Sequence, residues 1–101
     1  MRKPEAASQS VQRKLEILDR IIAHCKWGVS YNAERRGYYL KREAECPESG
    51  HYWREDARLH DFTLCTYADV LIEAGALTEC PCAVHTRMRE EAAAKKETVT
   101  P

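Results

Sequence analysis

Residues 11–27 are VQRKLEILDRIIAHCKW, and their apolar side chains recur at alternating spacings of four and three. That spacing gives a helix one apolar face, formed by Val11, Leu15, Leu18, Ile22 and Cys25. Serines just before the stretch can cap the first amides, and Gly28 stands where a C-terminal cap belongs. We therefore predict a helix over about 9–27 that packs its apolar face on the protein's own core. Pairing of two copies through this helix, as a homo-oligomer, is the alternative.

The segment at 29–45, after this helix, carries residues that favour extended structure. Its aromatic and aliphatic positions are typical of strands, and they are Tyr31, Tyr38, Tyr39 and Leu40. Residues 32–37 between them suit the connection of a hairpin. We predict a short hairpin or an irregular aromatic segment over 29–45, followed by a turn at 46–50 with the sequence Cys-Pro-Glu-Ser-Gly.

The second half of the chain predicts further helices. Thr66 and Asp69 form a start that resembles a capping box, Gly75 forms a stop, and Pro81 suits a first helical position. Together with the first helix, the pattern predicts three to four helices, at about 9–27, 55–61, 66–75 and 81–96. The predicted fold class is therefore α+β, mainly helical. It is one small domain over 1–101, with flexible tails at 1–7 and 97–101.

Composition limits the class of protein. The 101 residues include 16 basic and 16 acidic side chains, and 44% of them are apolar, which suffices for one domain with a modest core. Zero net charge excludes a uniformly basic nucleic-acid binder. No stretch without a charged residue exceeds seven residues, so we expect no membrane span and no secretory signal. Five cysteines, an odd number, then favour a reducing, cytoplasmic location over a disulfide framework.

The zero net charge conceals two segments of opposite sign. Residues 26–42 carry five basic side chains against one acidic, and residues 52–79 carry two basic against six acidic. All eight aromatic residues lie between Trp27 and Tyr67. Either the two segments close on each other inside the fold, or the basic one stays open for a partner.

The basic segment supplies the candidate binding surface. It interleaves aromatic rings with cations, and the candidate residues are Trp27, Tyr31, Arg35, Arg36, Tyr38, Tyr39, Lys41 and Arg42. Tyr, Trp and Arg are enriched among the residues that dominate protein–protein binding, so a protein partner is our leading interpretation. Rings that stack on bases and cations that meet phosphates make nucleic acid the alternative partner.

Two cysteine-containing stretches suggest a metal site. The stretch from Cys46 to His51, Cys-Pro-Glu-Ser-Gly-His, resembles the knuckle turn of zinc ribbons, although Ser49 stands where the second thiolate would be. That resemblance implies a binding module stapled by zinc. The second stretch is Cys-Pro-Cys-Ala-Val-His, which ends at His85. Tetrahedral zinc takes four thiolate or imidazole ligands. The predicted set is Cys46, Cys80, Cys82 and His85, with His51 as a substitute ligand.

Metal binding has a plain alternative, which is that the cysteines are reduced structural thiols, since free cysteine is often buried. We therefore expect either no cofactor or one structural zinc. The leading functional hypothesis is a non-catalytic cytosolic interaction or regulatory protein, of the accessory or host-interaction type that phages carry. A zinc-stapled nucleic-acid-binding module is the second hypothesis. A thiol- or metal-dependent enzyme is the third and the least favoured, because no catalytic motif or phosphate-binding loop is present.

Overall fold

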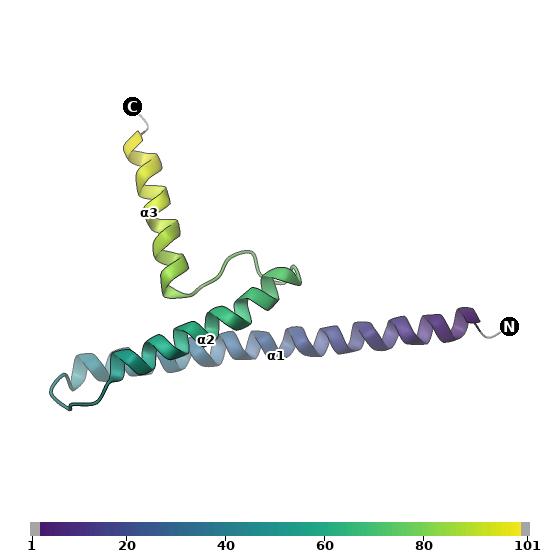
Figure 1. The fold of residues 1–101 in the computed structure, drawn as a ribbon, viewed down its shortest axis with the longest axis horizontal. Coiled ribbons are helices and arrows are strands. Elements are labelled where there is room, and N and C mark those ends of the chain that lie inside the picture. Colours follow the sequence, from purple (N-terminus) through teal and green to yellow (C-terminus); the bar gives the residue numbers. More distant parts are fainter. Residues whose placement is uncertain (1–2, 100–101) are drawn as a thin grey trace.

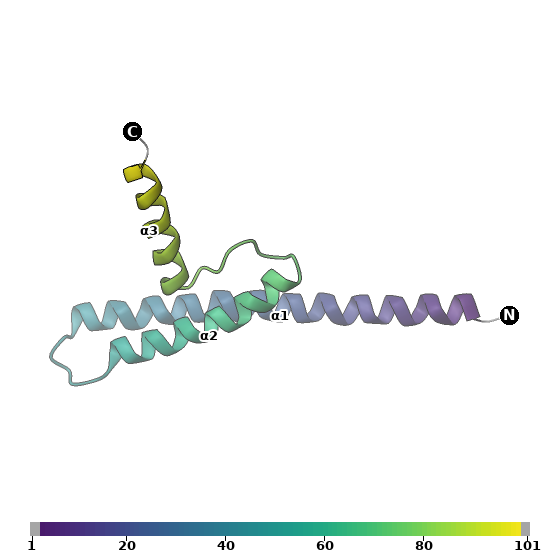
Figure 2. The same cartoon turned by 45° about the horizontal axis from the view of Figure 1, so that its top comes forward.

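Three helices form the part of the chain that the computed structural model describes, which is the backbone of residues 3–99 and the side chains of residues 8–97. They are α1 (Lys3–Glu45), α2 (Trp53–Glu73) and α3 (Ala83–Val99). α2 runs back along the second half of α1 as an antiparallel hairpin, and α3 leaves this pair at a steep angle (Figures 1 and 2). The mainly helical prediction is confirmed.

The short hairpin or irregular segment predicted at 29–45 is wrong, and the α+β class with it, because residues 3–99 contain no strand and α1 continues without a break to Glu45. Three positions at helical spacing explain the difference. The amide oxygen of Asn32 lies 2.8 Å from His60 Nδ1, Arg36 forms an ion pair with Asp61, and Tyr39 stacks on α2. Helical spacing places all three side chains on the side of α1 that contacts α2, and these contacts outweigh the extended preference of the tyrosines.

The two helices predicted at 55–61 and 66–75 are one helix, α2. Its buried positions alternate in spacing by four and three without interruption, and they are Ala57, Asp61, Leu64, Ala68 and Leu71. Thr66 caps no helix; its hydroxyl donates a hydrogen bond to the carbonyl of Phe62. The predicted stop is confirmed: Gly75 has a φ of 74°, and the amide of Ala76 bonds the carbonyl of Leu71. This is the Schellman arrangement, which favours glycine.

The last predicted helix and the tails differ from the structure at their boundaries. The helix expected at 81–96 runs over Ala83–Val99, so Pro81 precedes it. Of the residues expected in flexible tails, 3–7 and 97–99 have helical backbone, and 1, 2, 100 and 101 lie outside the described residues. The turn predicted at 46–50 is present, with Gly50 at a φ of 77°.

The core is small and lies where the loop before α3 crosses α2. Its buried members are Leu64, Ala68, Cys80 and Cys82, and partly buried residues pack around them, namely Val29, Ala33, Cys65 and Leu77. Three of these eight side chains are cysteines, so the chemistry of the thiols bears directly on what holds the fold together.

The apolar face of the first helix does not pack on this core, which corrects the expectation from its periodicity. Val11 is 56% exposed and Leu15 and Leu18 are each 51% exposed, because the first half of α1 extends past the end of α2 (Figure 1). Only Cys25, at the far end of the face, is buried. Pairing of two copies through this helix stays a prediction.

Two glycines of α1 provide a matched test of the α1–α2 packing. A Cβ at Gly28 would lie 2.5 Å from the Tyr67 ring, whereas a Cβ at Gly37 would have nothing within 4 Å. We expect Gly28→Ala to destabilise the fold by about 1–3 kcal/mol, because the ring must move. Gly37→Ala should instead stabilise it by up to about 1 kcal/mol, because alanine favours the helix. Urea unfolding measures both, and equal stability of the two variants would contradict the packing of α2 on Gly28.

Candidate metal centre

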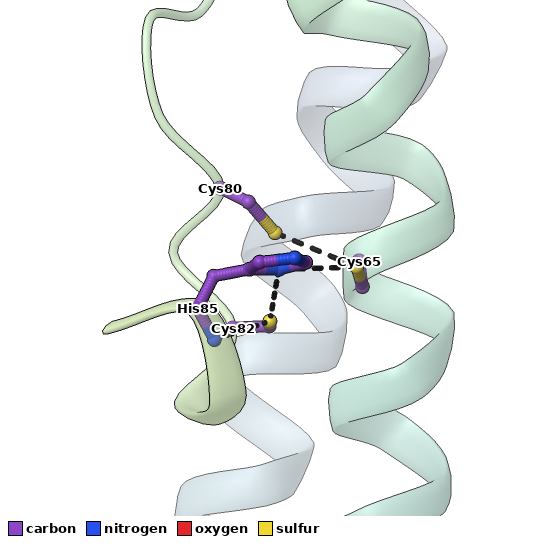
Figure 3. A group of neighbouring side chains, drawn as sticks. All are labelled: Cys65, Cys80, Cys82 and His85. Atoms are coloured by element: carbon purple, nitrogen blue, oxygen red, sulfur yellow. Dashed lines mark hydrogen bonds between the residues drawn. The ribbon is translucent and has the colours of Figure 1, made fainter. Parts of the chain in front are cut away.

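Four potential metal ligands gather where the loop between α2 and α3 meets α2. Cys65 lies in the middle of α2, Cys80 and Cys82 lie in the loop, and His85 lies in the first turn of α3. Figure 3 shows the three thiols and the imidazole pointing toward one another. Their ligand atoms all lie within 4.8 Å of one another.

The distances from Cys65 to Cys80 and to His85 match a tetrahedral site, and the distance between Cys82 and His85 is shorter. The sulfurs of Cys65 and Cys80 are 3.6 Å apart, and Nδ1 of His85 lies 3.7 Å from Cys65 Sγ and 3.0 Å from Cys82 Sγ. Bonds of about 2.3 Å to sulfur and about 2.0–2.1 Å to nitrogen, at tetrahedral angles, separate neighbouring ligands by roughly 3.6–3.8 Å. Small movements of the side chains would therefore accommodate a zinc ion at their centre.

Burial makes the thiols of Cys65 and Cys80 costly to ionise unless a cation joins them. Cys80 is 6% exposed and Cys82 is 3% exposed. Burial, together with the contact with the Cys80 thiol, raises the pKa of Cys65 to about 12. Burial also raises the pKa of Cys80. A divalent cation reverses this preference, since a coordinated thiol is deprotonated.

The first turn of α3 is held against α2 by groups beside the candidate ligands. Cys82 precedes the helix, and its sulfur accepts a hydrogen bond from the amide of His85 at 3.4 Å. The Asp61 carboxylate accepts the amide of Ala83 through both oxygens, at 3.0 and 3.1 Å. The same carboxylate forms an ion pair with Arg36 of α1. Asp61 thus links all three helices one turn away from Cys65, and supporting contacts of this kind orient metal ligands.

Three of the four residues predicted as ligands, Cys80, Cys82 and His85, are members of this cluster. Cys46, the fourth, is not a member: it follows the last residue of α1, and its amide bonds the carbonyl of Arg42. Cys65 completes the cluster instead. It was missed because a single cysteine inside an amphipathic helix has the pattern of an ordinary core residue, and no local motif marks it.

The stretch that resembles a zinc knuckle has other contacts. The Ser49 hydroxyl accepts hydrogen bonds from the His51 amide and from the Trp53 indole, at 3.2 and 2.9 Å. Nε2 of His51, the substitute ligand, lies 2.7 Å from the Asp56 carboxylate. These bonds hold the chain where it enters α2. Neither Cys46 nor His51 belongs to the cluster of Cys65, Cys80, Cys82 and His85.

The residues of the predicted binding surface divide into two groups. The inner group faces α2: Arg36 pairs with Asp61, Tyr39 stacks on Trp53 and His60, and Arg42 lies over the Trp53 ring.

The outer group, which we name the outer row, is Trp27, Tyr31, Arg35 and Tyr38. Its arginine lies 4.8 Å from the centre of the Tyr38 ring and donates a hydrogen bond to the Tyr39 hydroxyl. Hydrogen bonding to that hydroxyl raises the pKa of Arg35. Lys41 is exposed beside Glu45.

The two segments of opposite charge pack against each other along α1 and α2, but ion pairing between them is sparse. Within residues 8–97, Arg36–Asp61 is the one ion pair between the basic segment at 26–42 and the acidic segment at 52–79. Lys41 and Arg42 pair with Glu45 of the same helix, and Lys26 is exposed.

Comparison with known proteins gives no relative: no family model matches the chain, and no curated protein or solved structure is significantly similar to it. None of the helices in residues 3–99 combines the length and the apolar character that crossing a membrane requires. What the chain can do therefore follows from the chemistry of its own side chains.

Proposed function

We propose that the protein is a non-catalytic interaction protein whose helices are held together by one structural zinc ion. The observation that carries this proposal is the convergence of Cys65, Cys80, Cys82 and His85 on one point. Four protein ligands close a tetrahedral site, and a site with no position left for water is structural rather than catalytic. Three thiols with one imidazole are also ligands that select zinc over magnesium or calcium.

The ion would fix the direction of α3. Beyond its first turn α3 projects away from the other two helices (Figures 1 and 2), so the contacts around His85 determine where the helix points. Structural zinc contributes about 10–16 kcal/mol in small zinc-finger peptides. Few buried apolar side chains support this fold, so the free energy of zinc binding would add substantially to its stability.

The free thiols also indicate the kind of compartment in which the protein is found. All five cysteines are free, including two whose sulfurs are 3.6 Å apart. Thiols at that distance persist in a reducing environment or under a bound metal. We therefore propose a cytoplasmic protein.

The outer row supplies the proposed surface for a protein partner. Trp27 is 55% exposed, Tyr31 is 42% exposed and Tyr38 is 46% exposed, and these residue types dominate protein–protein binding. The Trp27 ring stacks on His24 one turn before it and on Tyr31 one turn after it, at centroid distances of 5.5 and 5.1 Å. Bases need open ring faces to stack on. Stacking on His24 and Tyr31 occupies the faces of the Trp27 ring, which favours a protein partner over single-stranded nucleic acid.

Alanine at both Trp27 and Tyr31 tests this surface. We expect the double variant to lose the partner that the wild-type protein recovers from an extract of its host, with affinity reduced about 30-fold or more. Phe62→Ala is the control, because Phe62 is an exposed aromatic residue of α2 outside the outer row. Retention of the same partner by the double variant would overturn the assignment of the outer row. Salt-sensitive binding of an oligonucleotide that requires Trp27 would favour the nucleic-acid alternative.

A further inference from the structure

A cleft of about 390 Å³ lies where all three helices meet, on the α1–α2–α3 junction that Asp61 links. Four arginines line it: Arg36 from α1, Arg54 and Arg58 from α2, and Arg87 from α3. Leu40 and Val84 contribute exposed apolar surface from α1 and α3. The cleft is therefore cationic and has aliphatic side chains on two of its sides.

Two of these arginines are available to a ligand. Arg36 pairs with Asp61, which also accepts the Ala83 amide, and Arg54 pairs with Glu43 at 2.8 Å. Arg58 and Arg87 are exposed, and no carboxylate of residues 8–97 forms an ion pair with either. Asp61 also lines the cleft but pairs with Arg36, so the guanidinium groups of Arg58 and Arg87 have no ion-pair partner among the described residues.

The other residues that line the cleft indicate whether the anion is a nucleic acid or an acidic peptide. No aromatic residue lines the cleft, so it offers no ring on which a base could stack. Val84 is followed one turn later on α3 by Met88, which is also exposed. Arginine and methionine beside aliphatic surface are typical of protein interfaces. This composition favours a peptide that carries both carboxylates and an aliphatic side chain.

We infer that this cleft binds an acidic peptide segment, whose carboxylates pair with Arg58 and Arg87 and whose aliphatic side chain packs against Leu40 and Val84. This inference rests on the proposed function, because the segment belongs to the protein partner. Val84 precedes His85, and Arg87 follows it by two residues. The metal centre would therefore set the position of the wall of the cleft that α3 forms.

The test is a fluorescence-anisotropy titration of the zinc-loaded full chain with a short fluorescein-labelled peptide made of glutamate and leucine. We expect saturable binding that weakens about 10- to 100-fold in the variant Arg58→Gln/Arg87→Gln, because each charged hydrogen bond is lost. The control Arg13→Gln/Arg20→Gln removes the same charge from the exposed first half of α1, and should bind as the wild type does. Zinc content and helicity are measured for every variant, so that a folding defect is recognised.

Three results would overturn the inference: no saturable binding of the peptide, equal binding by both double variants, or equal binding of a peptide whose glutamates are replaced by glutamine. Tighter binding of a single-stranded oligonucleotide that requires Arg58 and Arg87 would overturn it in favour of nucleic acid. If these results occur while the outer row still recovers its partner, only the acidic-peptide inference fails. If the wild-type protein recovers no partner from the extract, or contains no zinc, the proposed function fails instead.

Discussion

Replacing Cys65 with serine is expected to remove zinc from the protein and to release α3 from α2. Cys65 is the one member of the cluster that α2 supplies, so in the proposed zinc site its thiolate would tie α3 and its loop to that helix. A supporting residue around a metal ligand changes affinity by about 10- to 100-fold, and loss of a ligand itself should exceed that. The ion contributes about 10–16 kcal/mol in zinc-finger peptides, which is as large as the whole stability of many domains.

Metal analysis and a thermal unfolding curve of the Cys65→Ser variant measure this effect. We expect zinc content well below one ion per chain and loss of the cooperative transition seen for the wild type. Cys46→Ser is the matched control, because Cys46 is a half-buried cysteine outside the cluster, and it should keep both the metal and the transition. If Cys65→Ser behaves as Cys46→Ser does, the thiols are only reduced core residues.

Replacing Asp61 with asparagine is expected to destabilise the fold by about 3 kcal/mol, the lower part of the range for breaking a buried ion pair. The Asp61 side chain is 12% exposed and that of Arg36 is 24% exposed, so water screens the pair only in part. The variant leaves Arg36 without its counter-charge and weakens the cap on the Ala83 amide. Because that cap orients the first turn of α3 beside Cys82 and His85, zinc affinity should also fall by about 10- to 100-fold.

Urea unfolding and competition with a zinc chelator measure the two effects of Asp61→Asn separately. Glu43→Gln is the control, because it removes an ion pair with Arg54, whose side chain is 73% exposed. An exposed pair contributes no more than about 1 kcal/mol, so this control should remain close to the wild type in stability and in zinc affinity. A loss for Asp61→Asn no larger than that of Glu43→Gln would show that Asp61 does not link the three helices.

The helical character of the chain could be predicted from the sequence, but the length of its helices could not. The spacing from Val11 to Cys25 correctly indicated helix, and Gly75 correctly indicated the end of α2. The continuation of α1 past Gly28 depends on Asn32 and Arg36, whose partners lie 28 and 25 residues away in the chain. Polar residues that become buried through distant partners leave no periodic apolar signal, so the segment looked irregular.

The same distinction between near and distant partners explains which members of the Cys–His cluster could be predicted. Cys80, Cys82 and His85 lie within six residues, and their spacing alone indicated a shared site. Cys65 lies fifteen residues earlier, and only the path of the loop back across α2 brings it to the others. The exposure of the first half of α1 could not be predicted for a related reason, since an apolar face has the same periodicity whether or not another helix covers it.

The most direct measurement is X-ray absorption at the zinc edge on the full chain purified under reducing conditions without added metal, with the metal content determined on the same sample. We expect one zinc ion per chain with three sulfur ligands at about 2.3 Å and one nitrogen ligand at about 2.0–2.1 Å. Zinc content well below one per chain, together with a thermal transition that a chelator leaves unchanged, would contradict a fold held together at Cys65, Cys80, Cys82 and His85.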